Sequence, residues 1–379
     1  MAVGTNPLVS VVTCETYDLD AVRRAVTAAL APLGGIERYV RPGMRVLLKP
    51  NLLAASDLDH ALITHPAVVQ AVAEQVQAAG GTVLIGDSPA GPVQNPPPVW
   101  RRGGLTEVAR RTGATLVPFD GVEWRRKNGH DYFIARPVFD ADLIINLPKL
   151  KTHTLTLYTG AVKNLFGTIP GTRKREVHYR APGVPDFSQA LVDVLELVRP
   201  GLTLLDGVLG QEGEGPGRGG TPRRYNCLAA SDDPVALDAV ITDALGYRSG
   251  EVVHVAQAAA RGLGVADLGE VRVVGERRAL DFGEVALPRP RWYFQMPAWM
   301  GAPVRWAIRI HPQLDADACI RCGQCAAVCP ADAIAFEPRQ TPKFDLNRCI
   351  RCFCCAEVCP QGAITPYRNL AARLFGVGE

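Results

Sequence analysis

The feature that most constrains this chain is a cysteine motif that occurs twice in its last quarter. The motif is C-x2-C-x2-C-x3-C-P, and its cysteines are Cys319, Cys322, Cys325, Cys329, Cys349, Cys352, Cys355 and Cys359. A tight loop of this kind lets three thiolates reach three corners of one iron–sulfur cubane, while a distant fourth thiolate closes it. The spacing therefore predicts two 4Fe-4S clusters.

The repeat extends beyond the cysteines. Ile320 and Ile350 follow the first cysteine of each copy, and Ala-Ile pairs occur at 333–334 and 363–364. These apolar residues are expected to keep water from the sulfurs, which helps to set the reduction potential. Residues 313–368 resemble bacterial-type ferredoxins with two 4Fe-4S clusters, which implies a small α+β ferredoxin-like domain.

In two-cluster modules the fourth cysteine of each run ligates the other cluster. The first cluster is thus assigned Cys319, Cys322, Cys325 and Cys359, and the second Cys349, Cys352, Cys355 and Cys329. Zinc ribbons also use C-x2-C pairs, but they need two separate pairs rather than four cysteines ending in Cys-Pro. A disulfide scaffold is typical of small secreted chains and does not fit a long chain otherwise poor in cysteine.

Composition gives the remaining bounds. With 379 residues, 47% apolar and 21% charged, the chain is long enough for two globular domains. A net charge of +3 is too small to indicate nucleic acid as a partner. We find no basic leader with an apolar core and no 18-residue apolar run, so no transmembrane segment is expected. Because thiols and clusters need a reducing compartment, we expect a cytoplasmic protein.

Ahead of the cysteines, short β-rich runs alternate with helical patterns. Strands are predicted near 8–13, 44–49, 82–85, 114–119, 142–147, 202–205, 225–230 and 271–274, and helices near 19–33 and 66–79. This alternation predicts an α/β fold with a mostly parallel sheet and helices on both faces. The expected parts are an α/β domain at 1–285, a Pro- and aromatic-rich linker at 286–312, the ferredoxin domain at 313–368 and a tail at 369–379.

In such a sheet, ligands bind beyond the carboxyl ends of the strands. Candidates there for binding or catalysis are Lys149, Lys151, His153, Lys163, Asp206 and Glu212, and candidates for holding a cofactor are Asp87, Asn146 and Asn164. The cationic groups suit an anionic substrate, and the carboxylates suit acid–base work or a metal. We expect four of these residues to converge on one pocket, namely Lys149, Lys151, Lys163 and Asp206.

Charges also segregate along the chain. Residues 149–180 hold seven Lys or Arg against one Glu, and residues 206–243 hold seven Asp or Glu against three Arg. Two such segments lining one cleft would hold an anion beside a carboxylate or a hard cation. The run Arg173-Lys174-Arg175, by contrast, is expected to be a solvated loop face.

Other motifs are expected to have structural roles. Residues 215–220 match G-x-G-x-x-G but lead to Pro222 and a strand, not to the helix start that a dinucleotide needs, so they predict a flexible loop. Asp233, followed by Pro234, predicts a helix N-cap. The aromatic residues of 286–312 are expected to pack the ferredoxin domain against the main domain rather than to anchor the chain at a membrane surface.

Several phrases of the main domain resemble one family. They are residues 146–153, 163–167, 206–207 with the loop 212–220, and 231–238. Together with the second cysteine motif and its extra Cys354, they are similar to the family called domain of unknown function 362, over about 8–275 plus the C-terminal module. Members of that family often carry a ferredoxin module. The resemblance implies an architecture more than an activity.

Two functions stay open. One is an iron–sulfur-dependent oxidoreductase, in which two 4Fe-4S clusters relay single electrons to a small anionic substrate or cofactor in the cleft. The other is an electron carrier or maturation factor that acts on a partner protein without small-molecule turnover. Both need an electron donor or acceptor protein. A hydrolase or transferase lacks support, since no G-x-S-x-G, P-loop or H-E-x-x-H motif occurs, and the sequence names no further cofactor or metal.

Cys354 is the thiol in the repeat that the eight ligands leave over. Neighbouring side chains on an extended loop point in opposite directions, so we expect Cys354 to face away from the cluster held by Cys355. Cys354→Ser is therefore expected to keep about eight irons per chain and both cubane EPR signals, whereas Cys322→Ser loses or converts one cluster. Halved iron in Cys354→Ser would show that the second ligand set is misassigned.

Overall fold

A computed structural model describes residues 6–54, 56–89, 97–288 and 310–369. Its main sheet has ten strands. Eight of them lie on one path, and in chain order these are β1 (Leu8–Thr13), β2 (Arg45–Pro50), β3 (Thr82–Ile85), β4 (Thr115–Leu116), β7 (Leu143–Leu147), β10 (Leu202–Gly213), β11 (Gly220–Ser231) and β12 (Arg272–Gly275). Their order in the sheet is β12-β1-β11-β10-β7-β2-β3-β4.

Most neighbouring strands of this sheet are parallel, as the sequence predicts. The strands β10, β7, β2, β3 and β4 form one parallel run, and β12 is parallel to β1. The exception on the path is β11, which is antiparallel to β1 and to β10. The connection from β10 to β11 is residues 214–219, which is too short for the crossover that a parallel pair needs.

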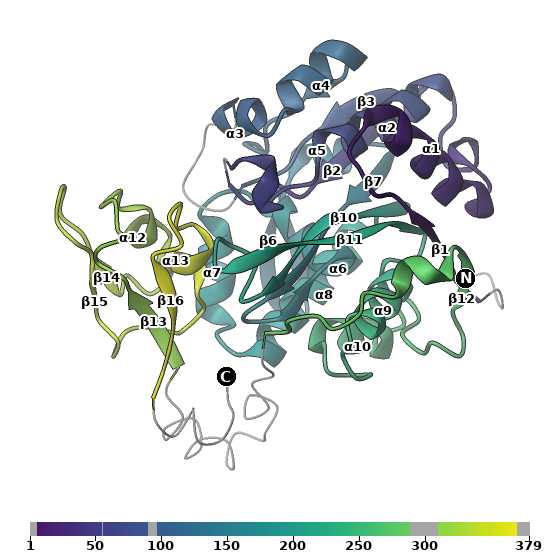
Figure 1. Ribbon diagram of the computed structural model, residues 1–379. Helices are drawn as coiled ribbons and strands as arrows, with labels where there is room; N and C mark the ends of the chain where they lie inside the picture. The colour runs from purple at the N-terminus through teal and green to yellow at the C-terminus, as the bar shows by residue number, and fades with distance from the viewer. Residues whose placement is uncertain (1–5, 55, 90–96, 289–309, 370–379) are drawn as a thin grey trace.

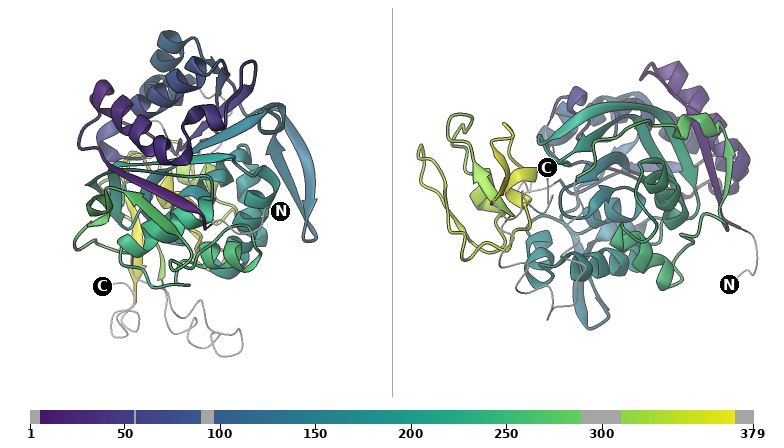
Figure 2. Two further views of the ribbon diagram at one scale, coloured as in Figure 1. Left: turned by 90° about the vertical axis from the view of Figure 1, so that its right-hand side faces the viewer. Right: turned by 60° about the horizontal axis from the view of Figure 1, so that its bottom comes forward.

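Helices cover both faces of the sheet (Figures 1 and 2). One face carries α1 (Leu19–Leu30), α2 (Pro66–Ala78), α3 (Pro97–Arg102) and α4 (Leu105–Thr112), and the other carries α6 (Ala161–Asn164), α8 (Val184–Val198), α9 (Pro234–Ala244) and α10 (Val253–Ala260). The strand β2 shows why two cores form, because side chains alternate across a strand. Val46 and Leu48 pack in one core, and Leu47 packs in the other.

Four strands of the α/β domain lie outside the runs predicted from the sequence. A hairpin of β5 (Val122–Lys127) and β6 (His130–Ala135) precedes the short helix α5 (Arg136–Asp140). Next to β10 lies β8 (Lys149–His153), which also pairs with β9 (Leu157–Thr159). The sequence of β8 is Lys-Leu-Lys-Thr-His and has no apolar run, yet all five residues are buried. Tertiary packing therefore places polar side chains inside the domain at this point.

The C-terminal module is a small α+β unit beside the α/β domain (Figures 1 and 2). Two-stranded sheets pair β13 (Ile310–Leu314) with β16 (Ile364–Arg368) and β14 (Ile334–Ala335) with β15 (Lys343–Phe344). Its helices are α12 (Gln324–Val328) and α13 (Cys354–Glu357). The predicted packing of the linker aromatics concerns residues that lie almost entirely in 289–309, outside the described residues. Among the helices that the structure describes, none is long and apolar enough to cross a membrane.

Asp233 is the N-cap of α9, as predicted. Its carboxylate accepts hydrogen bonds from the backbone N–H groups of Val235 at 2.8 Å, Ala236 at 2.9 Å and Val265 at 2.9 Å. Asp233→Ala is therefore expected to lower the free energy of unfolding by about 1–2 kcal/mol, because these donors lose their acceptor. Urea unfolding followed by circular dichroism measures the change.

Asp232→Ala is the matched control for this cap. Among the residues that the structure describes, the Asp232 carboxylate accepts only from Arg38 at 3.4 Å and Tyr39 at 3.3 Å, on a partly exposed surface. Its loss is expected to cost less than about 1 kcal/mol. Equal destabilisation by the two substitutions would contradict the capping role.

Candidate functional site

The two cysteine loops share one backbone geometry. Arg321 and Arg351 have φ angles of +57° and +58°, and Gly323 and Phe353 have φ angles of +72° and +62°. Backbone N–H groups donate to equivalent sulfurs in both copies, namely those of Cys319 and Cys349 at 3.4 Å, Cys329 at 3.2 Å and Cys359 at 3.3 Å. Such bonds stabilise thiolates and tune the potential of a bound cluster.

The cysteines of the first predicted ligand set lie around a common cavity. One small cavity is lined by all four cysteines of this set, namely Cys319, Cys322, Cys325 and Cys359. None of the eleven cysteines forms a disulfide. Four cysteines lining one space supply the type of soft donor that an iron–sulfur cubane requires.

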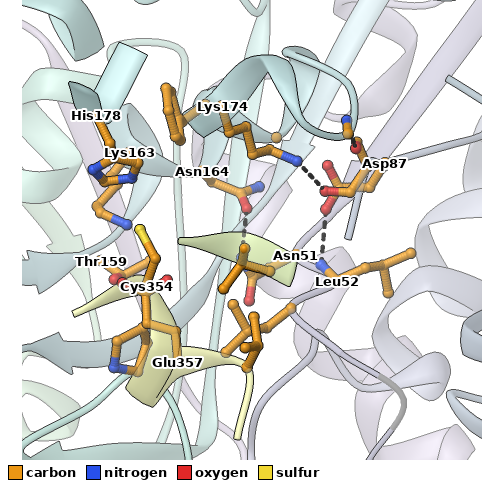
Figure 3. Close-up of a pocket in the computed structure, with 18 of the residues that line it drawn as sticks. Asn51, Leu52, Asp87, Thr159, Lys163, Asn164, Lys174, His178, Cys354 and Glu357 are labelled. Atoms are coloured by element: carbon orange, nitrogen blue, oxygen red, sulfur yellow. Dashed lines mark hydrogen bonds between the residues drawn. The ribbon is translucent and has the colours of Figure 1, made fainter. Parts of the chain in front are cut away.

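A second cavity, of about 100 Å³, lies where the α/β domain meets the module (Figure 3). Residues that follow β2 and β3 form one side of it, together with β8, β9, α6 and the helix α7 (Arg173–Arg180). Cys354, Glu357 and Val358 of the second cysteine loop form another side. The cavity thus joins the carboxyl edge of the sheet to the loop that carries Cys352 and Cys355.

Two of the predicted lysines, Lys151 and Lys163, line this cavity. The Lys151 ammonium donates to Asn51 Oδ1 at 2.6 Å and to the Leu62 carbonyl at 3.0 Å. Burial, with Lys163 and Lys149 nearby, lowers the pKa of Lys151 to about 7. Burial also lowers the pKa of Lys163. A lysine that titrates near neutrality can bind an anion in one state and release a proton in passing to the other.

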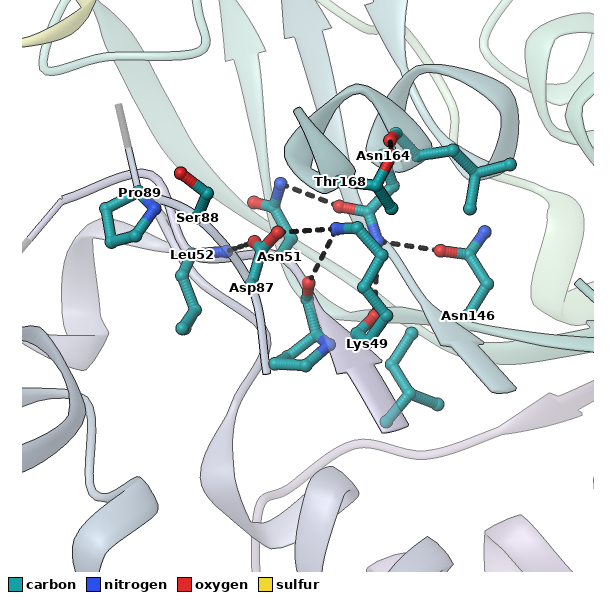
Figure 4. Close-up of polar contacts among 12 residues, drawn as sticks. Lys49, Asn51, Leu52, Asp87, Ser88, Pro89, Asn146, Asn164 and Thr168 are labelled. Atoms are coloured by element: carbon teal, nitrogen blue, oxygen red, sulfur yellow. Dashed lines mark hydrogen bonds and ion pairs between the residues drawn. The ribbon is translucent and has the colours of Figure 1, made fainter. Parts of the chain in front are cut away.

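The predicted cofactor residues form a polar network at the same edge (Figure 4). Lys49 donates to Asp87 at 2.7 Å, and both side chains are buried. The Asn164 side chain accepts from Asn51 at 3.0 Å and donates to Asn146 at 2.8 Å. Asp87 and Asn164 line the cavity, whereas Asn146 does not, so Asn146 orients Asn164 from behind.

His153 is buried against the module. Its Nδ1 accepts from the N–H groups of Leu155 at 3.0 Å and Thr156 at 3.3 Å, and its Nε2 lies 3.2 Å from Glu357 Oε1. Nε2 therefore carries the proton of a neutral ring. Burial lowers the pKa of His153 to about 4. Burial alone raises the pKa of Glu357, but His153, Lys163 and His178 outweigh it and bring that pKa to about 2.

The expectation of a solvated face at residues 173–175 is wrong for two of its three residues. Lys174 lines the cavity and donates to the carbonyls of Ser88 at 2.7 Å and Pro89 at 3.2 Å. Burial lowers the pKa of Lys174 to about 7. The charge run forms the start of α7, and the surrounding loops and the module cover it, which the local sequence does not reveal.

Arg175 lines the cavity and also reaches the module. Its guanidinium donates to the carbonyls of Ala327, at 3.1 Å, and Cys329, and to Asp332 at 2.9 Å. Cys329 is one of the predicted ligands of the second cluster. The sequence analysis assigned Arg175 to a solvated face and did not name Glu357, because packing between distant segments brings each of them to the cavity.

The four residues predicted to converge on one pocket are divided between two places. Lys151 and Lys163 line the cavity, whereas Lys149 and Asp206 form a buried ion pair of 2.8 Å outside its lining. The register of β10 explains the division. Asp206 lies opposite Lys149, but Gln211 lies opposite Lys151, so β10 is shifted between the two positions.

Glu212 and the glycine-rich loop lie beyond this point. Glu212 pairs with Arg223 at 2.7 Å and does not line the cavity. The loop predicted to be flexible packs against the module, because a Cβ on Gly217 would lie 3.0 Å from the Ala356 carbonyl and Glu357 Cα. Only glycine allows this close approach of two backbones.

Family models match both parts of the chain. Residues 318–363 match the description "4Fe-4S dicluster domain", and residues 46–243 match "Domain of unknown function (DUF362)". The fold and the cysteine loops thus define an α/β protein with a C-terminal iron–sulfur module for 4Fe-4S cofactors. Since the second match covers more than half of the sequence, the chain belongs to the family of domain of unknown function 362.

The chain is also similar to individual proteins. A thylakoid-associated protein of Synechocystis sp. is 40% identical over 243 residues, which cover 62% of this chain and 74% of that protein. Among solved structures, the lactate racemase apoprotein from Thermoanaerobacterium thermosaccharolyticum has a TM-score of 0.37 at 12% identity and covers 62% of this chain and 56% of its own. A protein from Thermotoga maritima has a TM-score of 0.36 at 12% identity, and the match covers 59% of this chain and 57% of that chain. The chain spans less than two thirds of either solved chain.

Lys151 links stability to pH. Its pKa is about 7 in the folded protein against the usual 10.5. Below pH 7 the folded and unfolded states both hold this proton, so it adds no pH dependence there. Between pH 7 and about 10 only the unfolded state keeps it, so the free energy of unfolding rises with pH, by up to about 1.4 kcal/mol per pH unit.

Lys151→Met is expected to make this rise shallower in urea unfolding between pH 7 and 9.5. Lys127→Met is the matched control, since the Lys127 ammonium pairs with Glu196 at 2.5 Å on the partly exposed hairpin, away from the cavity. If the dependence of the unfolding free energy on pH is unchanged in Lys151→Met, the assignment of a lowered pKa to Lys151 is wrong.

Proposed function

We propose that this protein is an iron–sulfur reductase, in which two 4Fe-4S clusters relay single electrons to a small anionic substrate or cofactor bound in the cavity between the α/β domain and the module. One observation carries the proposal. Cys354, which lies between Cys352 and Cys355 in the chain, lines the same cavity as Lys151 and Lys163. The loop that holds three predicted ligands of the second cluster is thus itself a wall of the anion-binding space.

The cavity residues have separable roles in this proposal. Lys163 and Lys151 attract and bind the anion, and Lys151, with its pKa near 7, also supplies a proton to the reduced product and regains it from solvent. Phe166 and Val358 contribute apolar wall that limits access of water. An electron-donor protein is the source of the electrons.

The test is anaerobic reduction of the reconstituted protein with dithionite, followed by a screen of small anions for reoxidation. Reoxidation shows as return of the visible absorbance of the oxidised clusters. We expect at least one anion to reoxidise the wild-type protein. Lys163→Ala is expected to slow this step by about tenfold or more while iron content and cluster absorbance stay the same.

Lys127→Ala serves as the matched control and is expected to behave as the wild-type protein does. If no small molecule reoxidises the clusters but a purified protein partner does, the reductase proposal fails. Equal rates of reoxidation in Lys163→Ala and the wild-type protein would show that the cavity takes no part in the reaction.

The second candidate is an electron carrier or maturation factor that acts on a partner protein. Ile320, next to Cys319 of the first set, keeps 58% of its surface exposed, and Cys322 is also exposed. An apolar side chain on a cluster loop suits a docking partner. The same reoxidation screen separates this candidate from the reductase.

A cytoplasmic location is part of the proposal, because none of the eleven cysteines forms a disulfide and the cofactors need a reducing compartment. The relative from Synechocystis sp. is named as thylakoid-associated. Fractionation of the source cells into soluble and membrane portions distinguishes a freely cytoplasmic protein from one that associates with a membrane.

A further inference from the structure

Three hydrogen-bond donors on different elements point to what the cavity binds. No hydrogen bond or ion pair joins the Lys163 ammonium on α6 to any residue that the structure describes. Arg175 Nε on α7 and Thr159 Oγ1 on β9 are buried and likewise have no hydrogen-bond partner among the described residues. All three residues line the cavity (Lys163 and Thr159 in Figure 3). Buried donors without acceptors are rare, and a bound ligand that supplies acceptors resolves them.

The charges around the cavity do not balance. Five cationic side chains lie at its lining or immediately behind it, namely Lys49, Lys151, Lys163, Lys174 and Arg175. Three carboxylates accompany them: Asp87 and Glu357 line the cavity, and the exposed Asp332, outside the lining, pairs with Arg175. When every lysine is protonated, five positive and three negative charges leave a net charge of +2 around the cavity. A ligand with two negative charges would neutralise the site and keep Lys151 and Lys174 protonated.

The size and the remaining lining narrow the ligand further. At roughly 10–15 Å³ for each water-sized position, a cavity of about 100 Å³ has room for roughly seven to ten non-hydrogen atoms. Leu52, Phe166, Val328 and Val358 make part of the lining apolar. A ligand that fits has a short carbon body and anionic ends.

We infer that the cavity is a binding site for a compact organic dianion, a dicarboxylate or a small phosphate monoester, held by Lys163, Arg175 and Thr159. The inference rests on the cavity that the proposed function uses, and it names the ligand class. The three donors surround the anionic groups, and the apolar lining contacts the carbon body. Because Arg175 also donates to the carbonyl of Cys329, the bound dianion contacts a side chain that touches the second cysteine set.

Isothermal titration calorimetry on the anaerobically purified holoprotein tests this inference. Succinate represents the dicarboxylates, ethyl phosphate the phosphate monoesters, and acetate a single carboxylate. We expect succinate or ethyl phosphate to bind about tenfold or more tightly than acetate, and the tighter of the two identifies the anionic group. Lys163→Met is expected to weaken that binding by about tenfold to hundredfold.

Two further variants separate binding from folding. Thr159→Val keeps the shape of the side chain and removes only the hydroxyl, so it is expected to weaken binding by a few-fold with unchanged iron content. Lys127→Met is expected to bind as the wild-type protein does. Absence of dianion binding to the wild-type holoprotein, acetate binding as tightly as both dianions, or equal affinity in Lys163→Met would each overturn the inference.

The outcome for the dianion is distinguishable from the outcome for electron transfer. If a dianion binds through Lys163 while no small anion of the reoxidation screen reoxidises the reduced clusters, this inference is supported and the proposed reductase activity is removed. Reoxidation by a neutral molecule, with no dianion binding, overturns this inference and leaves electron transfer to a small molecule in place.

Discussion

The burial of lysine ammonium groups at the carboxyl edge of the sheet is the constraint on which the rest of the site depends. A buried charge is costly unless a partner compensates it. Asp87 compensates Lys49, and Asp206 compensates Lys149. Among the described residues, Lys151 donates hydrogen bonds only to an amide oxygen and a backbone carbonyl, and Lys163 has no hydrogen bond or ion pair. The edge therefore has two parts. In one part, Lys49 and Lys149 have carboxylate partners within the protein, and in the other, Lys151 and Lys163 have none in the part of the chain that the structure describes.

The module completes this edge as well as carrying the cysteines. Glu357 lies 3.2 Å from His153, Arg368 pairs with Glu214 at 2.8 Å, and Arg175 reaches the carbonyls of the first cysteine loop. The first two of these contacts involve the second cysteine loop and the strand that follows it. Residues of the cavity therefore directly contact the backbone that positions the predicted cluster ligands. A ligand in the cavity can influence that backbone without a long pathway between separate sites.

Much of the α/β scaffold is readable from the sequence, and the site is readable only in part. Apolar runs locate β1, β2, β3 and β7 because buried strands need β-branched and leucine side chains. The strand β8 escapes this reasoning, since its sequence is polar and its burial comes from its neighbours β10 and β9. Lys149 and Lys151 lie two residues apart and read as equivalent, yet the register shift in β10 gives them different surroundings.

What the sequence determined by itself is local. The cysteine spacing specifies the predicted ligands because three of them lie on one tight loop, and Asp233 followed by Pro234 specifies a helix start within one turn. Only the tertiary structure decided which lysine has a carboxylate partner, and that Arg175, Thr159 and Glu357 share a cavity. These residues are up to about two hundred positions apart, and their proximity comes from packing of whole elements, which no short pattern encodes.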